Sequence, residues 1–315
     1  MAGLQNIMKN KVILVTGASG LIGRHLCPLL VSRGWDVHGA SLDPEMEGMP
    51  ENRWHKLNLL IPGEARRILT KIQPSVLVHL AWFVAPGRWA DEPENLDWTR
   101  ASLELAREFV NAGGSRLVVA GSCLEYDWNY GYCSEIRTPC NPHTLYGAAK
   151  NSLRTVLEPF MGRAGGSLAW GRPFLIYGPY EHPDRLVPAV IRSLLKSEPA
   201  LCSHGRQIRD YLYVKDVAEA FARIIESDIQ GAVNICAGTP VTVAEMANRI
   251  GELMGMPDLI RLGAIPAAAT DTPLVVGDRN RISNELGWIP AYSLEQGLVE
   301  SINWWKNVSP VLIGP

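Results

Sequence analysis

A short apolar run followed by three spaced glycines near the start of the chain constrains the fold most. Residues 11–34, KVILVTGASGLIGRHLCPLLVSRG, begin as a buried strand and continue with helical spacing up to a glycine. Gly17 permits a tight turn, Gly20 lets the backbone approach a pyrophosphate, and Gly23 lets the helix pack closely on the strand. The helix N-terminus would add unpaired N–H groups and a positive dipole end. The segment therefore predicts a dinucleotide-binding turn between the first strand and the first helix.

Strand and helix patterns alternate through the first half of the chain. DVHGAS (36–41), SVLVHLA (75–81) and RLVVAGS (116–122) are predicted strands, whereas 64–72 and 97–113 have helical spacing. Parallel strands need crossover connections of this kind. We therefore expect an α/β fold of the Rossmann type, with a doubly wound parallel sheet.

The regular alternation ends near residue 172. Prolines become frequent, residues 210–227 resemble a strand that turns into a helix, and GAVNICAG resembles a last strand of the main sheet. Amphipathic helices follow. We expect a Rossmann domain from residues 1–172 and about 207–237, with a smaller, interleaved C-terminal substrate lobe from about 173–206 and 238–315.

Composition excludes several classes of protein. Among 315 residues, 47% are hydrophobic and 20% are charged, which is typical of globular chains, and the net charge of −2 gives no field for nucleic acid or an anionic membrane. No apolar run is long enough to cross a bilayer, and the first ten residues lack the core of a secretion signal. The six cysteines are scattered and predict reduced thiols rather than disulfides or a metal site. We expect a cytoplasmic protein without nucleic-acid or membrane partners.

Three residues suggest acid–base chemistry. In NPHTLYGAAK (141–150), Tyr146 and Lys150 share one helix face, and a nearby ammonium favours phenolate, moving the tyrosine pKa from about 10 toward the working pH. This spacing also arises by chance in many proteins. Ser122, however, ends a predicted strand where ligands of open α/β sheets bind. The three residues together on a dinucleotide fold favour a catalytic interpretation.

The tip of the second strand bears on the choice of dinucleotide. A carboxylate there would favour NAD by accepting hydrogen bonds from the adenosine ribose. Ser41 occupies the expected tip, and Asp43 follows two residues later. A hydroxyl tolerates a 2′-phosphate, although no arginine follows immediately. The pattern favours NADP(H) over NAD(H), and Asp43 keeps NAD(H) open.

Six motifs in order resemble the extended short-chain dehydrogenase/reductases that modify nucleotide sugars: TGASGLIG, HLAW, GSCLEY, YGAAK, GRPFLIYGP and RQIRDYLYVKDVAEA. The resemblance implies a nucleotide-sugar substrate, a homodimer formed through helices near 93–113 and 144–161, and catalysis by Ser122, Tyr146 and Lys150. The cofactor-binding residues that it implies are Gly17, Ser19, Gly20, Leu21, Ile22, Gly23, Ser41, Asn58, Leu59, Leu80, Ala81, Tyr146, Lys150 and Pro173. The implied substrate-binding residues are Cys123, Trp82, Arg185 and Arg209.

Some of these assignments have alternatives. Arg209 matches the family arginine that pairs with a sugar-nucleotide diphosphate, but it could instead form a surface ion pair with Asp210. Leu175 replaces the asparagine that normally touches the diphosphate. The aromatic-rich insert 82–98, with Trp82, Phe83, Arg88 and Trp89, would either shape the sugar pocket or pack the lobes together.

Departures from the family pattern narrow the reaction. The 4,6-dehydratases place an acidic pair where this chain has Cys123 and Leu124, and Glu125 would point to the other side of an extended segment. The 3,5-epimerase-reductases move protons with a cysteine and a histidine. Cys123 lies one residue from the matching position, His182 is a candidate partner, and a buried thiol is usually inert.

The resulting expectation is a 4-keto(-6-deoxy)-sugar ketoreductase that uses NADPH, with Tyr146 as proton donor. An NDP-sugar 4-epimerase with tightly bound NAD is the alternative. A 4,6-dehydratase and a non-catalytic NADP-sensing protein are weaker alternatives.

Overall fold

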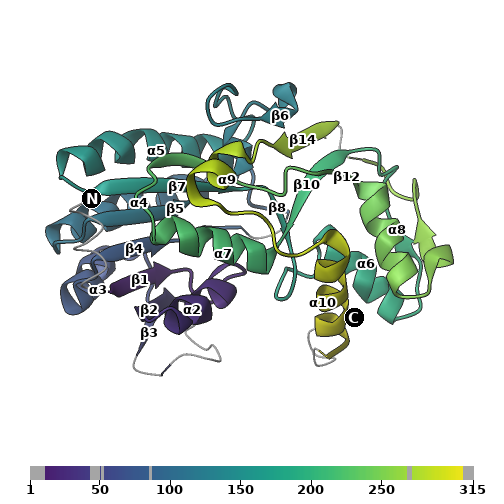
Figure 1. Cartoon of the computed structure of the whole chain (residues 1–315), viewed down its shortest axis with the longest axis horizontal. Helices are drawn as coiled ribbons and strands as arrows, with labels where there is room; N and C mark the ends of the chain where they lie inside the picture. Colours follow the sequence, from purple (N-terminus) through teal and green to yellow (C-terminus); the bar gives the residue numbers. More distant parts are fainter. Residues whose placement is uncertain (1–10, 43–49, 51–52, 85–86, 268–271, 308–315) are drawn as a thin grey trace.

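The computed structural model describes residues 11–42, 50, 53–84, 87–267 and 272–307. A broad parallel sheet with helices on both faces forms one side of the molecule, and a smaller lobe built around α6, α8 and α10 forms the other (Figure 1). None of the described helices has the length and apolar character needed to span a bilayer.

The main sheet has seven strands in the order β11-β7-β5-β4-β1-β2-β3, and every neighbouring pair is parallel. This confirms the doubly wound Rossmann-type sheet, including the expected last strand at residues 231–235. The strands are β1 (Val12–Thr16), β2 (Asp36–Ser41), β3 (Trp54–Lys56), β4 (Val76–His79), β5 (Arg116–Ala120), β7 (Ser167–Pro173) and β11 (Gly231–Ile235).

Two apolar cores hold the helices to the two faces of this sheet. One core joins the sheet to α2 (Gly23–Ser32) and α7 (Val214–Ile225), and the other joins it to α3 (Glu64–Ile72), α4 (Glu94–Asn111) and α5 (Leu145–Arg163). Helix α3 shows why these segments are helical, since Ala65, Ile68 and Leu69 recur at helical spacing and are buried, while charged residues lie opposite.

The smaller lobe contains a second sheet and the remaining long helices. Its strands are β12 (Pro240–Thr242), β10 (Ile208–Tyr213), β14 (Leu274–Gly277) and β6 (Tyr132–Cys133), with β8 (Leu175–Tyr177) paired to β10. The helices of this lobe are α6 (Leu186–Leu195), α8 (Val243–Leu253) and α10 (Leu294–Asn307), whereas the short helix α9 (Asn280–Leu286) packs on β11 of the main sheet. Short pieces of this lobe are β9 (Ala200–Leu201), β13 (Ile260–Arg261) and the 3₁₀ turn η4 (Pro257–Leu259). The 3₁₀ turns η2 (Cys123–Glu125), which packs on α5, and η3 (Trp128–Tyr130) follow β5 of the main sheet.

The pairing of β10 bears on the predicted domain boundaries. Strand β10 falls within the 207–237 segment assigned to the Rossmann domain, but it pairs with β8, β12 and β14 in the second sheet. Helix α7, which follows directly, packs on α2 of the Rossmann domain. By sheet pairing, the return to the Rossmann domain therefore falls after Tyr213. The other boundaries remain predictions.

A buried histidine in β4 should make folding stability depend on pH. His79 is 2% exposed, with Nδ1 2.8 Å from Thr16 Oγ1 and Nε2 2.8 Å from Ser102 Oγ. Burial, with the charge of Lys150, lowers the pKa of His79 to about 3. The unfolded chain, with a histidine pKa near 6.5, therefore binds the proton more readily as the pH falls below that value.

We expect the titration of His79 to lower the free energy of unfolding by about 2 kcal/mol between pH 8 and pH 5. His79→Gln should remove this part of the pH dependence, because glutamine does not titrate. Urea unfolding at a series of pH values measures it. The control is His204→Gln, which alters an exposed histidine. Equal pH slopes in the wild type and His79→Gln would contradict the prediction.

Candidate active site

The predicted cofactor residues lie at one edge of the main sheet, where all seven parallel strands present their carboxyl ends. The glycine turn joins β1 to α2, Ser41 ends β2, and Pro173 ends β7. Other predicted residues follow β3 and β4: Asn58, Leu59, Leu80 and Ala81. Asp43, which argued for NAD(H), lies outside the described residues. The topology thus places these residues along one continuous edge of the sheet, where a ligand can bind.

The glycine turn fits a dinucleotide. Gly17 has φ +71°, and a Cβ there would come within 2.7 Å of the Ala81 backbone nitrogen. A Cβ on Gly23 would come within 2.5 Å of the Ala18 carbonyl oxygen. Side chains are therefore excluded at positions 17 and 23, and no side chain caps the start of α2 after Ile22. An uncapped helix N-terminus beside bare backbone suits a pyrophosphate.

Asn58 is already engaged within its own turn. Its Oδ1 accepts a hydrogen bond of 3.0 Å from the Leu60 backbone amide. Leu59 is buried in the core beneath α3 and α4. These two residues therefore shape the loop after β3.

Ser122, Tyr146 and Lys150 come together above β5. Thr144 caps α5 by accepting from the Gly147 amide at 3.1 Å, which places Tyr146 in the first turn and Lys150 one turn later. Lys150 Nζ donates to the Ala120 carbonyl oxygen at 2.7 Å, two residues before Ser122. The sequence spacing and the strand end therefore specify one site.

The pKa values of Tyr146 and Lys150 are shifted differently from what the sequence predicts. Burial raises the pKa of Tyr146, although the Ser122 hydroxyl and the charge of Arg185 act to lower it. Burial lowers the pKa of Lys150 to about 7, against the opposing effect of Glu125. The prediction that Lys150 moves the pKa of the phenol toward the working pH is wrong for the protein alone, because burial raises this pKa more than the neighbouring groups lower it. The phenol is a proton donor in this state.

Aromatic side chains from the 82–98 insert enclose Tyr146. The rings of Trp89 and Trp82 meet the Tyr146 ring edge-on, at centroid distances of 5.3 and 6.3 Å. The Tyr146 amide also donates to the Ala90 carbonyl oxygen at 2.8 Å. Arg88, by contrast, is exposed and pairs with acidic neighbours. The insert therefore covers the start of α5, and its residues 85–86 lie outside the described part.

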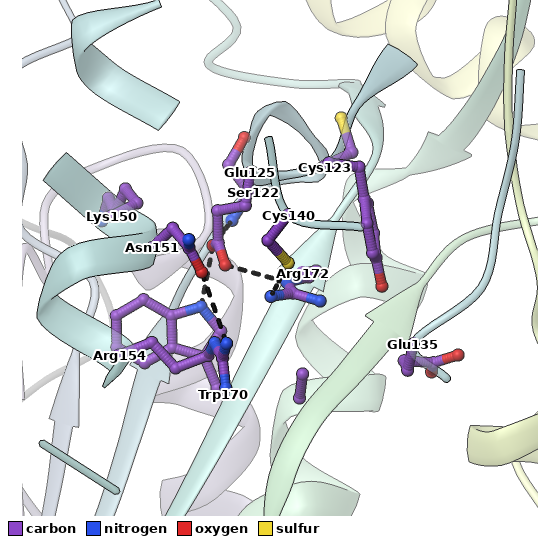
Figure 2. A network of polar contacts seen from close by, with 12 residues as sticks. Ser122, Cys123, Glu125, Glu135, Cys140, Lys150, Asn151, Arg154, Trp170 and Arg172 are labelled. Atoms are coloured by element: carbon purple, nitrogen blue, oxygen red, sulfur yellow. Dashed lines mark hydrogen bonds and ion pairs between the residues drawn. The ribbon is translucent and has the colours of Figure 1, made fainter. Parts of the chain in front are cut away.

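Glu125 is fully buried and bound on both carboxylate oxygens (Figure 2). Oε1 accepts from the Ser122 amide and from Trp170 Nε1, both at 2.8 Å, and Oε2 accepts from Arg172 Nε at 2.8 Å. Burial acts to lower the pKa of Arg172, but the charge of Glu125, together with Tyr126 and Cys140, outweighs burial and raises that pKa. Glu125 thus anchors the Ser122 turn and has no free oxygen for a substrate proton.

A family model now identifies the chain. Residues 13–236 match the model of the NAD dependent epimerase/dehydratase family, which is more than half of the sequence. The chain belongs to this family. It is therefore an enzyme of the extended short-chain dehydrogenase/reductase class, with a nicotinamide dinucleotide as its cofactor.

Individual members are distant. A dTDP-glucose 4,6-dehydratase of Xanthomonas campestris pv. campestris is 26% identical over 93% of this chain and 92% of that protein. A GDP-6-deoxy-D-talose 4-dehydrogenase of Aggregatibacter actinomycetemcomitans is 26% identical over 94% and 97%. The crystal structure of a Thermus thermophilus UDP-glucose 4-epimerase complex with NAD has a TM-score of 0.82 at 22% identity, covering 95% of this chain and 100% of that one. The last likeness shows the fold alone.

Cys123 and His182, the candidates for the proton-moving pair of an epimerase-reductase, lie in different surroundings. Cys123 is 3% exposed and packs against Cys133 and Phe174, and burial raises the pKa of its thiol above the ordinary value. His182 has a half-exposed side chain whose Nδ1 accepts from the Asp184 amide at 3.3 Å. Cys123 is packing rather than an accessible group, and a proton-moving pair with His182 has no support.

The predicted substrate arginines occupy different surroundings. Arg185 is exposed at the start of α6, with its guanidinium 5.8 Å from the Trp89 ring centroid. Arg209 is buried in β10, where Nη1 donates to the Ile208 carbonyl oxygen and the guanidinium lies 5.9 Å from the Trp128 ring. The Asp210 carboxylate is buried and accepts from three backbone amides instead. A surface ion pair between neighbours therefore does not describe Arg209. Leu175 lies in β8 opposite Tyr211.

Four further residues matter and were not singled out from the sequence. Arg172 and Trp170 hold Glu125, and Asn95 holds Trp82 through a 2.9 Å hydrogen bond. Glu181, in the loop after β8, is 8% exposed, and burial raises its pKa to about 8. Trp170 and Arg172 lie 45 and 47 positions from Glu125, and Asn95 lies 13 positions from Trp82, so no local pattern marks these contacts.

Proposed function

We propose that the chain is an NAD(P)-dependent oxidoreductase of nucleotide-activated sugars, namely a 4-keto(-6-deoxy)-sugar ketoreductase. The observation that carries this proposal is the full engagement of Glu125, together with Cys123 and Leu124 where a dehydratase would have an acidic pair. Without a carboxylate to take a carbon-bound proton, loss of water is disfavoured. Similarity to a relative named as a 4-dehydrogenase also supports oxidation and reduction at a sugar carbon.

The chain's own residues would manage the proton and the position of the ketone. A nicotinamide dinucleotide held at the glycine turn would supply a hydride for reduction of the keto carbon. Tyr146, whose pKa is raised by burial, gives its proton to the oxygen as negative charge develops there. Ser122 donates a hydrogen bond to the same oxygen, and the Lys150 ammonium offsets the charge left on the phenolate. Arg209 and Arg185 would pair with the diphosphate of the substrate.

The enclosure of Tyr146 favours a reductase over an epimerase. An epimerase must let a keto-sugar present its opposite face to the cofactor before the hydride returns. Trp82 and Trp89 both approach the Tyr146 ring edge-on, and Tyr146 itself is only 8% exposed. Rigid indoles beside the proton donor would hinder rotation of a sugar ring next to Tyr146. Net reduction needs no such rotation.

Incubation with candidate 4-keto-sugar nucleotides tests the reaction. A ketoreductase consumes one NADPH for each sugar reduced, whereas isomerisation without net consumption would indicate the epimerase. Tight NADPH binding without turnover of a broad panel of sugar nucleotides would instead favour a non-catalytic sensor.

The register of β2 and β3 supports NADP(H) as the preferred cofactor. Ser41 pairs with Lys56 across the two parallel strands, so their side chains extend on the same face of the sheet. Lys56 is exposed at the end of β3. A hydroxyl with a nearby ammonium suits the 2′-phosphate that distinguishes NADP from NAD, and it supplies the cation that the sequence after Ser41 lacks.

We expect Ser41→Asp and Lys56→Glu each to weaken NADPH binding by about tenfold or more, because a carboxylate would oppose the 2′-phosphate. NADH binding should change much less. Titration of the reduced nicotinamide fluorescence measures both affinities. The matched control is Lys71→Glu, at the far end of α3. An unchanged ratio of NADPH to NADH affinity in both variants would refute the preference.

Assembly and location are also proposals. The resemblance implies a homodimer through α4 and α5, and each helix carries an exposed apolar residue, Leu96 at 61% and Val156 at 51%. Apolar groups on paired helices support burial against a second copy. We propose a cytoplasmic homodimer with a small-molecule substrate and without nucleic-acid or membrane partners.

A further inference from the structure

The ammonium of Lys150 has unusual neighbours. Its Nζ lies 3.9 Å from the centroid of the Trp82 ring and donates to the Ala120 carbonyl oxygen. Lys150 is only 2% exposed. Among the described residues it forms no ion pair. Glu125 from η2 acts to raise the pKa of Lys150, and the charge of Lys150 acts to lower the pKa of His79 from β4. Tyr146 lies one turn before Lys150 on α5. The face of an indole therefore occupies the place that a counter-ion would take.

Trp82 is held firmly in this position. Its Nε1 donates to Asn95 Oδ1 at 2.9 Å, and Asn95 Nδ2 donates in turn to the carbonyl oxygens of Trp89 and Glu92. Asn95 is fully buried in the first turn of α4. The plane of the indole is thus fixed by a hydrogen bond to a residue that is itself bonded twice to the backbone. The Trp98 ring also lies near it, with a centroid distance of 6.2 Å and an interplanar angle of 33°.

One side chain therefore contacts both members of the catalytic pair. Trp82 presents its face to the Lys150 ammonium and meets the Tyr146 ring edge-on at 89°. A buried amine loses its proton more readily than an exposed one, because the charged form has lost its hydration. The negative π face of an indole compensates for part of that loss, and it does so most strongly in a desolvated site.

We propose that Trp82 is a positioning residue for the catalytic pair, whose indole face keeps Lys150 charged and directed along Tyr146 in a site where Lys150 forms no ion pair with any described residue. The inference rests on the proposed function for its catalytic meaning. It assigns Trp82 to the acid–base machinery rather than to the sugar pocket or to packing alone. The neighbouring Trp89, whose ring meets the Tyr146 ring edge-on, remains available for the substrate.

Replacing Trp82 tests the proposal without relying on turnover. In protein labelled with ¹³C at the lysine ε-carbon, the Lys150 resonance is assigned by its absence in Lys150→Arg. We expect its titration midpoint to fall by about one pH unit in Trp82→Leu, and by less in Trp82→Phe, which keeps a π face. Trp98→Leu is the packing control, and its midpoint should stay at the wild-type value. A midpoint that is the same in Trp82→Leu and the wild type overturns the proposal.

The pH profile of reduction gives the second measurement. The alkaline limb of kcat should move to lower pH by the same amount in Trp82→Leu, with partial recovery in Trp82→Phe. A fall in kcat that is equal at every pH would indicate a structural role and overturn the proposal. If the NMR midpoint moves but no keto-sugar is reduced by the wild type, the role of Trp82 stands and the proposed function fails. Should Trp82→Leu not fold, the comparison of Trp82→Phe with the wild type decides.

Discussion

Tyr146→Phe should lower the rate of keto-sugar reduction by about 10²- to 10⁴-fold, the usual contribution of a general acid, while NADPH binding stays near the wild-type value. The change removes one hydroxyl from a buried ring and leaves its edge-on contacts with Trp82 and Trp89 in place. The protein should therefore keep its fold. Single-turnover kinetics, with fluorescence titration of NADPH, measures the two effects separately.

A matched variant distinguishes this effect from a general loss of a phenol. Tyr213 also donates a hydrogen bond, to Glu300 Oε2 at 2.7 Å, but it lies in β10 of the smaller lobe. Tyr213→Phe should reduce stability slightly and leave the chemical step almost unchanged. If Tyr146→Phe retained more than about a tenth of wild-type turnover, Tyr146 would not be the proton donor.

The largest effect on stability should come from Glu125→Gln, which removes one charge from a buried pair. The side chains of Arg172 and Glu125 are 1% and 0% exposed, so the guanidinium would be left without a counter-ion. Loss of one partner from a buried pair costs about 3–5 kcal/mol. We expect a decrease of this size in the free energy of unfolding, measured with urea.

Glu158→Gln provides the comparison for this experiment. Its ion pair with Arg154 spans one turn of α5, and its side chain is 36% exposed. The change should cost no more than about 0.5 kcal/mol. If Glu125→Gln were as stable as Glu158→Gln but lost turnover, Glu125 would be catalytic, and the exclusion of dehydratase chemistry would be wrong.

The parts of the fold that follow local rules could be predicted from the sequence. Helix α3 spans Glu64–Ile72, the same residues as its apolar spacing predicts, and β1, β2, β4 and β5 fall within their β-branched runs. Ser122 and Tyr146 were located because a strand end and a capped helix start have local signals. Such signals depend on neighbours in sequence, and they determine the Rossmann sheet.

The remaining features depend on contacts between distant segments. Strand β6 has two residues and is stabilised by pairing with β14, more than 140 positions later, so no run of apolar residues announces it. The Glu125–Arg172 pair and the Asn95–Trp82 hydrogen bond likewise join separate segments of the chain and have no local sequence signal. The raised pKa of Tyr146 also depends on burial by the 82–98 insert, which is why the sequence predicted the opposite direction.

The fate of the transferred hydrogen tests the central claim most directly. Reduction of a 4-keto-sugar nucleotide with NADPH deuterated at the transferred position should give a product that carries one deuterium at the newly formed carbinol carbon, with one NADPH oxidised. An epimerase returns its substrate's own hydrogen from a bound cofactor. Product formed without deuterium and without oxidation of NADPH would contradict the assignment as a ketoreductase.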